Sequence, residues 1–230
     1  MQLTPKKTTA LLAFLFFDAL VVLALVVLFQ IQSDRKSEAA LREIGVTIYP
    51  EASMLSDFRL LDQRGEFFTK ADLHGRWSLV FFGFTNCPDI CPITMAELGQ
   101  FYAGLDFSED EKPRVILVTV DPGEDNPESM AAYLENYSEE FIGLSGDPKQ
   151  IAQLASELYV GYGDVVKGEV VSISHDHEGP AIEVEAVQED YIIEHSAHIA
   201  VINPQGDYYA VMRAPHRDQD LIKAFRGLIR

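Results

Sequence analysis

The chain has 230 residues, of which 47% are hydrophobic and 23% are charged, a composition typical of a folded protein rather than a disordered one. Its 36 acidic residues outnumber its 18 basic residues, which gives a formal net charge of −18 at pH 7. Nucleic-acid binding depends on clustered Lys and Arg, so this charge argues against a nucleic-acid partner and favours a cationic ligand or a basic protein surface.

The N-terminal part carries one long apolar run. Residues 1–7 form a short tail, and residues 8–31 follow as an apolar run of about 24 residues. A helix of that length covers roughly 36 Å, enough to cross a bilayer core of about 30 Å. The run is longer than the core of a signal peptide and no A-x-A pattern follows it directly, so we expect a retained transmembrane anchor. Asp18 interrupts it at a cost of about 2.5–3.5 kcal/mol, and is either a tolerated, protonated carboxyl group or a contact for a partner helix.

The charges around this run determine its orientation only weakly. Lys6 and Lys7 precede it, and Arg35 and Lys36 follow it. A short tail before a long polar region favours a cytoplasmic N-terminus with the remainder exported. We therefore expect a single-pass protein of a bacterial inner membrane whose domain lies in the periplasm. The alternative is a mitochondrial inner membrane with the domain facing the intermembrane space.

Residues 32–52 are expected to form a linker, and residues 53–230 a single domain. The apolar segments 77–84 and 114–121 lack polar alternation, which predicts central strands covered on both faces. The other expected elements are a hairpin at 57–69, helices at 92–105, 127–137, 148–159 and 217–230, a strand at 141–147 and a strand pair at 198–213. This order predicts an α/β fold with helices on both faces of a mixed sheet.

Residues 164–190 do not fit this core pattern. Apolar residues alternate with polar ones at 171–173 and again at 182–186, on either side of an EGP turn. This pattern predicts an inserted β-hairpin. His175 and His177 lie near its tip, where side chains two residues apart share one face of a strand and could hold Cu(II). The simpler interpretation is that His175 and His177 are polar side chains at the tip that bind no ligand.

Both cysteines of the chain, Cys87 and Cys91, occur in the motif NCPDICP after the first predicted central strand. They could form a structural disulfide, a redox couple or a soft-metal site, although a disulfide across so short a loop restricts the unfolded chain little. Pro92 fits a first helical turn and disfavours helical conformation at the preceding residue. We therefore expect the helix to begin at Pro92 with Cys91 at its cap, where the helix dipole would favour the thiolate.

The segment FFGFTNCPDICP closely resembles the signature of the Sco/SenC family, membrane-anchored copper proteins of cytochrome c oxidase assembly. VTVDPGEDNPE is similar to that family's DP-x-x-D segment, here residues 121–125, and YIIEHSAHIAVINPQG is similar to the segment that carries its histidine ligand. The resemblance covers nearly all of the chain beyond the apolar run. It implies a thioredoxin-like fold in which Cys87, Cys91 and His195 hold copper.

The chemistry of these residue types agrees with that implication, because soft thiolates select Cu(I) and imidazole also suits copper. His195 precedes a predicted strand. A thioredoxin-like sheet would bring this strand back beside the loop that leads from the first central strand to Cys87 and Cys91, which we call the cysteine loop. The family usually has aspartate before this histidine, whereas this chain has Glu194, which could orient the imidazole differently. We interpret His198 as a bystander, and His74 and His216 belong to no motif.

The resemblance implies a copper metallochaperone rather than an enzyme, with the copper-site subunit of a respiratory oxidase as a partner and another copper chaperone as a further one. The competing class is a periplasmic thiol–disulfide oxidoreductase that reduces the cysteines of the oxidase copper site. The C-x-x-x-C spacing differs from the C-x-x-C of redox motifs. In addition, the proline that thioredoxins place before the strand facing their active site is absent, since none occurs between Pro180 and Pro204. A copper or redox sensor is a third class that the sequence leaves open.

Overall fold

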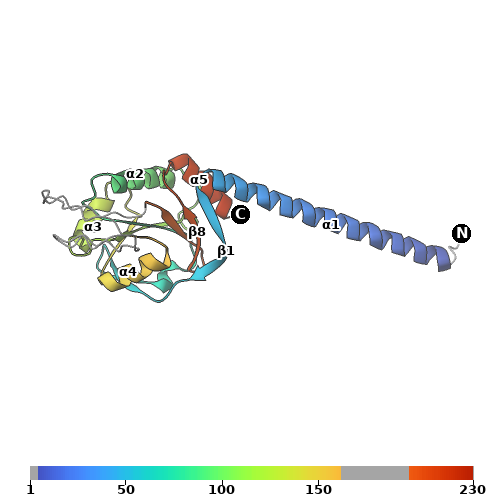
Figure 1. Cartoon of the computed structure of the whole chain (residues 1–230), viewed down its shortest axis with the longest axis horizontal. Helices are drawn as coiled ribbons and strands as arrows, with labels where there is room; N and C mark the ends of the chain where they lie inside the picture. The colour runs from blue at the N-terminus through green and yellow to red at the C-terminus, as the bar shows by residue number, and fades with distance from the viewer. Residues whose placement is uncertain (1–4, 162–196, 230) are drawn as a thin grey trace, which may run out of the picture.

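A long N-terminal helix leads into a domain in which helices cover a twisted sheet (Figure 1). The computed structural model describes residues 5–161 and 197–229, so residues 1–4, 162–196 and 230 lie outside the described part. The hairpin expected at 164–190, with His175 and His177, is therefore outside the described residues, as are Glu194 and His195.

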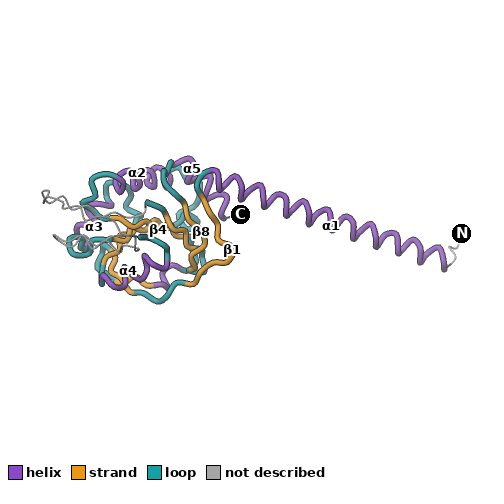
Figure 2. The backbone as a smooth tube through the Cα atoms, in the orientation of Figure 1, coloured by secondary structure: helices purple, strands orange, loops and turns teal. Residues whose placement is uncertain are grey.

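The domain is built on one mixed sheet, drawn in orange in Figure 2. Within the described ranges it has eight strands in the order β1-β8-β7-β4-β5-β6-β2-β3. Its centre is parallel, formed by β4 (Ser78–Gly83), β5 (Arg114–Thr119) and β6 (Ile142–Ser145). The antiparallel strands are β1 (Val46–Met54), β2 (Arg59–Asp62), β3 (Phe67–Thr69), β7 (Ile199–Ile202) and β8 (Asp207–Met212).

Helices cover both faces of this sheet, which confirms the predicted α/β architecture. α2 (Ile90–Ala103) follows β4 and packs beside α5 (Asp218–Leu228), whereas α4 (Pro148–Glu157) lies on the opposite face (Figure 1). α3 (Pro127–Leu134) connects β5 to β6, and a short 3-10 helix, η1 (Lys70–Leu73), precedes β4. α3 and α4 begin at the predicted prolines, where the missing N–H leaves no donor unpaired.

The central strands are apolar on both faces, as their uninterrupted apolar sequences predicted. All six residues of β4 are buried. Phe81, Leu117 and Ile199, on three adjacent strands, are fully buried. Phe101 of α2 and Phe225 of α5 pack edge to face with their ring centroids 6.0 Å apart. Burial of each such side chain contributes about 1.5–3 kcal/mol, so this core is the main source of the domain's stability.

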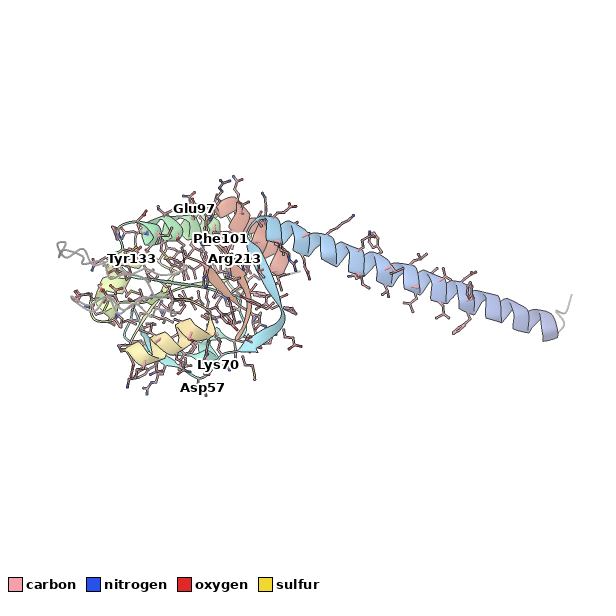
Figure 3. The ribbon with its side chains drawn as sticks, in the orientation of Figure 1. Asp57, Lys70, Glu97, Phe101, Tyr133 and Arg213 are labelled. Carbon is pink, nitrogen blue, oxygen red and sulfur yellow. The ribbon has the colours of Figure 1, made fainter. Side chains whose placement is uncertain are left out.

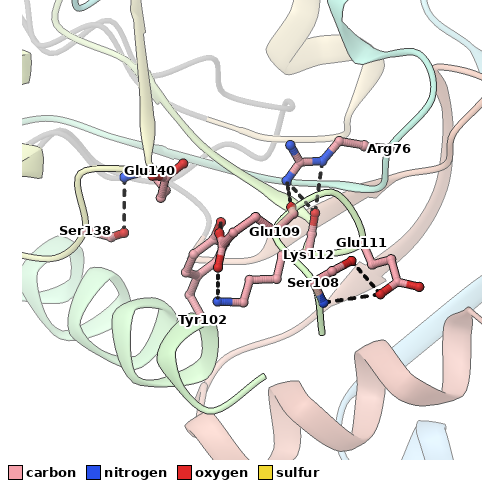
Figure 4. Close-up of polar contacts among 8 residues, drawn as sticks. All are labelled: Arg76, Tyr102, Ser108, Glu109, Glu111, Lys112, Ser138 and Glu140. Carbon is pink, nitrogen blue, oxygen red and sulfur yellow. Dashed lines mark hydrogen bonds and ion pairs between the residues drawn. The ribbon is translucent and has the colours of Figure 1, made fainter. Parts of the chain in front are cut away.

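A polar network fixes the chain at the amino-terminal end of β4 and β5 (Figure 4). The Arg76 guanidinium donates to the carbonyl oxygens of Glu109 at 2.9 Å and of Lys112 at 2.7 and 3.1 Å. Lys112 pairs with the Glu109 carboxylate at 2.8 Å, and its ammonium group lies 4.7 Å from the centre of the Tyr102 ring. The loop between α2 and β5 is thereby held against the residues that lead into β4.

α1 (Pro5–Glu43) is longer than the sequence predicted. It is the one helix of the described ranges that is long and apolar enough to cross a membrane, and its side chains from Phe16 to Ile31 are exposed. The expectation of a linker at 32–52 is wrong, because the helix continues to Glu43 and β1 pairs with β8 from Val46 onward. Helix-forming residues continue after Ile31 without glycine or proline, until Gly45 takes a left-handed conformation (φ 82°) that ends the helix.

Leu41 attaches the end of α1 to the domain. It is 5% exposed, and its methyl groups lie against Gly227 of α5, where an added Cβ would come within 2.9 Å of them. We expect Leu41→Ala to lower the free energy of unfolding of the domain by about 2–4 kcal/mol, because the shortened side chain leaves a cavity. The measurement is urea unfolding followed by the fluorescence of the single tryptophan, Trp77.

The control is Glu38→Ala on the same helix, since the only ion pair that Glu38 makes within the described residues is an exposed one with Arg42 at 3.9 Å. It should change the free energy by less than about 0.5 kcal/mol. Equal, small effects of both substitutions would show that the end of α1 is not part of the core.

Candidate functional site

The two cysteines lie where the first central strand gives way to a helix. β4 ends at Gly83, and α2 begins at Ile90 with Asp89 as its N-cap residue. Cys91 is therefore in the first turn of α2 and not at its cap, so the prediction that the helix begins at Pro92 is wrong by two residues. Pro92 is tolerated there because the N–H groups of a first helical turn have no partner within the helix.

The two thiols differ in exposure. The two are not joined by a disulfide, and Cys91 is fully buried whereas Cys87 is partly exposed. The Cys87 backbone N–H donates to the Phe84 carbonyl at 3.3 Å, which closes a tight turn between β4 and α2. The loop therefore presents one sulfur to the surface and keeps the other inside the domain.

Gly83 makes room for the buried sulfur. A Cβ at this position would come within 2.8 Å of the Cys91 Sγ atom and within 3.1 Å of the Phe81 ring. Any side chain at the end of β4 would therefore displace Cys91. The glycine in the FFGF segment is explained by this close approach, which the sequence did not reveal.

Burial raises the pKa of the Cys91 thiol, and its hydrogen bond with the Cys87 side chain and the negative charge of Asp125 raise it further. The prediction of a thiolate favoured by the helix dipole is therefore wrong for Cys91. Desolvation of the charged form outweighs the effect of the helix terminus. A cation that binds to this sulfur must replace its proton, so metal binding here would release protons to the solvent.

A buried carboxylate ties the cysteine loop to the neighbouring strands. Asp125 is 1% exposed, and its side chain accepts hydrogen bonds from the backbone N–H of Thr85 at 3.0 Å, from the Thr85 hydroxyl and from the Thr119 hydroxyl at 2.6 Å. Its carbonyl oxygen accepts a fourth bond, from the Ser145 hydroxyl at 2.6 Å. Thr85 lies two residues before Cys87, so this network sets where the cysteine loop begins.

Sequence reasoning identified the segment 121–125 but missed its three hydroxyl partners. Each of them is a Ser or Thr at or just beyond the carboxyl end of a buried strand: Thr85 after β4, Thr119 at the end of β5 and Ser145 at the end of β6. The carboxyl ends of neighbouring parallel strands meet at one edge of a sheet, which is where α/β proteins place their functional sites. The Ser and Thr residues at the carboxyl ends of the predicted buried strands were therefore the sequence signal for these hydrogen-bond partners.

The described residues bring Cys87 and Cys91 together, and they include no group of three or more His, Cys, Asp and Glu side chains placed to hold a metal. The third predicted ligand, His195, and its neighbour Glu194 lie outside the described part. The strand that follows them is described: β7 runs antiparallel to β4, with Ile199 opposite Phe81.

His198 and His216 each contact a backbone carbonyl oxygen. The Nε2 atom of His198 lies 3.3 Å from the Leu158 carbonyl oxygen, and that of His216 lies 2.7 Å from the Ala197 carbonyl oxygen. Burial lowers the pKa of both imidazoles, so both stay neutral near pH 7. The two rings thereby hold the chain that enters β7.

A mixed sheet with one thiol in the loop after its first central parallel strand and a second in the first turn of the following helix defines a protein of the thioredoxin-like class. Within that class, the chain belongs to the SCO1/SenC family, whose family model matches residues 47–230. This match begins at the second residue of β1, in agreement with a sheet that starts before residue 53.

Known relatives agree with this assignment. The mitochondrial protein SCO2 homolog of Homo sapiens is 34% identical over 208 residues, which cover 87% of this chain and 68% of the human protein. Bradyrhizobium japonicum ScoI with copper bound is 26% identical, with a TM-score of 0.59 over 76% of this chain and 98% of that one. Apo Sco1 of Thermus thermophilus is also 26% identical, with a TM-score of 0.61 over 79% of this chain and 95% of that one.

Gly83→Ala tests the packing of the buried sulfur. We expect a loss of about 1–3 kcal/mol in unfolding free energy, because the added methyl group forces Cys91 or β4 to move. Gly123→Ala is the matched control, since the nearest atom to its added Cβ would be 3.9 Å away. Urea unfolding of both variants measures the difference, and a Gly83→Ala variant as stable as its control would contradict the close approach.

Asp125→Asn tests the carboxylate network. The amide has one acceptor oxygen in place of two, so at least one donor of Thr85 or Thr119 loses its partner at a cost of about 2–3 kcal/mol. We also expect faster alkylation of Cys91 in the folded protein, because the cysteine loop is less firmly held. The exposed Asp106→Asn should change neither the stability nor the alkylation rate; a similar null result for Asp125→Asn would show that the network does not hold the loop.

Proposed function

We propose that this chain is a membrane-anchored copper metallochaperone, which binds one copper ion through Cys87, Cys91 and His195 and delivers it to the copper site of a respiratory oxidase during assembly. The observation that carries the proposal is the pair of cysteines, not joined by a disulfide, that lie between the end of β4 and the first turn of α2 in a SCO1/SenC protein. The relative from Bradyrhizobium japonicum, described with copper bound, supports copper as the cargo.

The chemistry of the pair fits a soft, monovalent cargo. Thiolates select Cu(I), and a site with two sulfurs and one nitrogen keeps the coordination number low. Because Cys87 is partly exposed, its sulfur can be reached by an incoming ligand of a partner protein. Ligand exchange at Cys87 while Cys91 still holds the ion is therefore a reasonable route of transfer.

The register of β7 supports His195 as the third ligand. Since Ile199 pairs with Phe81, the chain enters β7 at the end of β4 where the cysteine loop starts. His195 lies four positions before Ile199, and a fully extended chain covers at most about 14 Å over that stretch. The imidazole is thus within chain reach of the cysteine loop, and Glu194 is a candidate for orienting it.

The length and composition of α1 support membrane anchoring. We place the domain in the periplasm of a bacterium, with the mitochondrial intermembrane space as the alternative. The acidic character of the chain, with a net charge of −18, favours docking on a basic surface of the oxidase copper-site subunit or of another copper chaperone.

A thiol–disulfide oxidoreductase is the second candidate function, favoured by the hydrogen bond between the Cys87 and Cys91 side chains. If the protein is chiefly a reductase, metal-free wild type should reduce a partner peptide disulfide. Both cysteine-to-serine variants should abolish this activity, whether copper is present or not.

Copper stoichiometry and X-ray absorption test the metallochaperone. The reduced chain should bind one Cu(I) with two sulfur neighbours. Cys87→Ser and Cys91→Ser should each weaken binding by more than about 100-fold, since loss of an outer partner alone costs 10–100-fold. His195→Ala should weaken binding of Cu(II) in particular without unfolding the domain.

The control for these substitutions is His74→Ala, an exposed histidine that belongs to no motif. It should bind copper like the wild type. Unchanged affinity in Cys87→Ser would remove the two-thiolate site, and full retention in His195→Ala would mean that the third ligand is another group.

A further inference from the structure

Three tyrosines line a pocket of about 380 Å³ beside β1 and β8. They are Tyr49 of β1, Tyr208 of β8 and Tyr159, which follows the end of α4. His198 and Arg213 are the other polar residues of its wall, which alanine and valine side chains complete. Among the described residues no carboxylate lines it, although the chain has a net charge of −18. The volume lies within the range of about 300–1,000 Å³ that is typical of small-molecule sites.

The three tyrosine rings pack against one another. The ring centroids of Tyr49 and Tyr208 are 5.0 Å apart, and that of Tyr159 lies 6.1 Å from Tyr208 and 6.5 Å from Tyr49. Tyr208 is 1% exposed and lies deepest, Tyr49 is half-buried, and Tyr159 is 70% exposed. A flat ring of a ligand can therefore stack on this cluster from the solvent side, in an offset or tilted arrangement.

The backbone of Tyr159 is strained. Its φ angle is 55°, in the left-handed region that residues other than glycine and asparagine rarely adopt. The Tyr159 N–H donates to the Ser156 carbonyl at 3.1 Å and the Val160 N–H to the Ala155 carbonyl at 2.8 Å, so Tyr159 occupies the position after α4 where glycine is usual. Because the ring is mostly exposed, its packing explains little of this cost. Strained residues cluster at binding sites, which points to a ligand as the reason for an aromatic side chain here.

Two kinds of hydrogen-bond donor line the pocket beside the rings. Arg213, labelled in Figure 3, follows β8 on the side of the domain next to α1, where its backbone N–H donates to the Gly45 carbonyl at 3.0 Å. Its Nη1 atom donates to the Thr47 hydroxyl at 2.7 Å, and within the described residues its guanidinium makes no ion pair. The Tyr49 and Tyr208 hydroxyls lie 3.2 Å apart. Only one of these two can donate to the other, so the second O–H remains available to an acceptor in the pocket.

We propose that this pocket binds a small aromatic carboxylate. Its flat ring stacks on Tyr159 and Tyr49, and its carboxylate accepts hydrogen bonds from the Arg213 guanidinium and from the tyrosine hydroxyl pair. A carboxylate matches the planar fork of a guanidinium with two parallel hydrogen bonds. Since Arg213 is the one charged group among the described lining residues, a monoanion leaves the occupied pocket neutral. The inference goes beyond the proposed function and involves none of the proposed copper ligands.

Calorimetric titration of the full-length chain in detergent with benzoate tests the proposal, with protein-free micelles as the blank. We expect saturable binding at one site. Cyclohexanecarboxylate keeps the charge but lacks the flat ring, and should bind about fivefold more weakly because ring stacking is lost. Benzamide keeps the ring but lacks the charge, and should bind at least about tenfold more weakly because the charge-assisted hydrogen bonds are lost.

Two variants test the two halves of the site. Tyr159→Gly removes the exposed ring and places glycine where the left-handed backbone favours it, so benzoate should bind about fivefold more weakly while the urea midpoint of unfolding stays the same or rises. Arg213→Gln should weaken benzoate binding at least about tenfold and abolish the preference for benzoate over benzamide. Arg226→Gln is the matched control, because it removes the same charge from an exposed position on α5, and it should bind benzoate like the wild type.

The proposal is overturned if the wild type shows no saturable benzoate binding or binds the three probes equally. It is also overturned if Tyr159→Gly or Arg213→Gln retains wild-type affinity, or if Arg226→Gln weakens binding as much as Arg213→Gln does. A marked loss of stability in Tyr159→Gly would overturn it too, since the ring would then have a packing role. None of these outcomes concerns copper binding by the cysteines, so a failure here is distinguishable from a failure of the proposed function.

Discussion

The carboxylate of Asp125 is the interaction on which the rest of the site depends. It is a nearly inaccessible acidic group whose side-chain partners are the N–H and O–H donors of Thr85 and Thr119. Burying such a group is tolerable only when its acceptor positions are occupied. The bonds connect the carboxyl ends of the central parallel strands, so the start of the cysteine loop is fixed by the protein interior. The position of Thr85, and with it the start of the loop, is therefore set by hydrogen bonds of the protein itself.

The two thiols use this fixed loop in different ways. The Cys91 sulfur packs closely against Gly83, and burial keeps the thiol protonated in the absence of a cation. Cys87 reaches the surface. In the proposed function this asymmetry separates retention from release, since the buried sulfur is shielded from competing ligands and the accessible one can be approached by an acceptor. A symmetric, fully exposed pair would hold copper with no such order of release.

Much of the fold could be predicted from the sequence because its signals are local. Buried parallel strands such as β4 and β5 have uninterrupted apolar sequences, and the prolines at 127 and 148 mark helix starts that the structure confirms. The cysteine loop could be placed between a strand and a helix for the same reason. The end of α1 could not, because residues 32–43 are polar and helix-forming at once, and only packing of Leu41 on α5 shows that they belong to the domain boundary.

The properties of the candidate site were less predictable because they arise between elements that are distant in sequence. The helix-terminus argument for Cys91 considered one helix, whereas the protonation of that thiol depends on β4 and on Asp125. The hydroxyls of Thr85, Thr119 and Ser145 become a set only when the strands are in register. Histidine 195 could be proposed only from its resemblance to a family motif, and it stays a prediction.

The pairing of β1 has a consequence for geometry at a bilayer. Val46 pairs with Met212, Met212 with Ile199, and Ile199 with Phe81. The first residue of β1, which follows α1, is therefore level with the carboxyl-terminal part of β4. Three strand spacings separate these points, about 14 Å. Residues 32–43 extend the helix by only about 18 Å beyond its apolar part. In Figure 1, β1 lies on the side of the domain next to α1, and α3 lies at the opposite end. With α1 embedded in a lipid bilayer, the end of the domain that carries α3 would face away from the lipid headgroups.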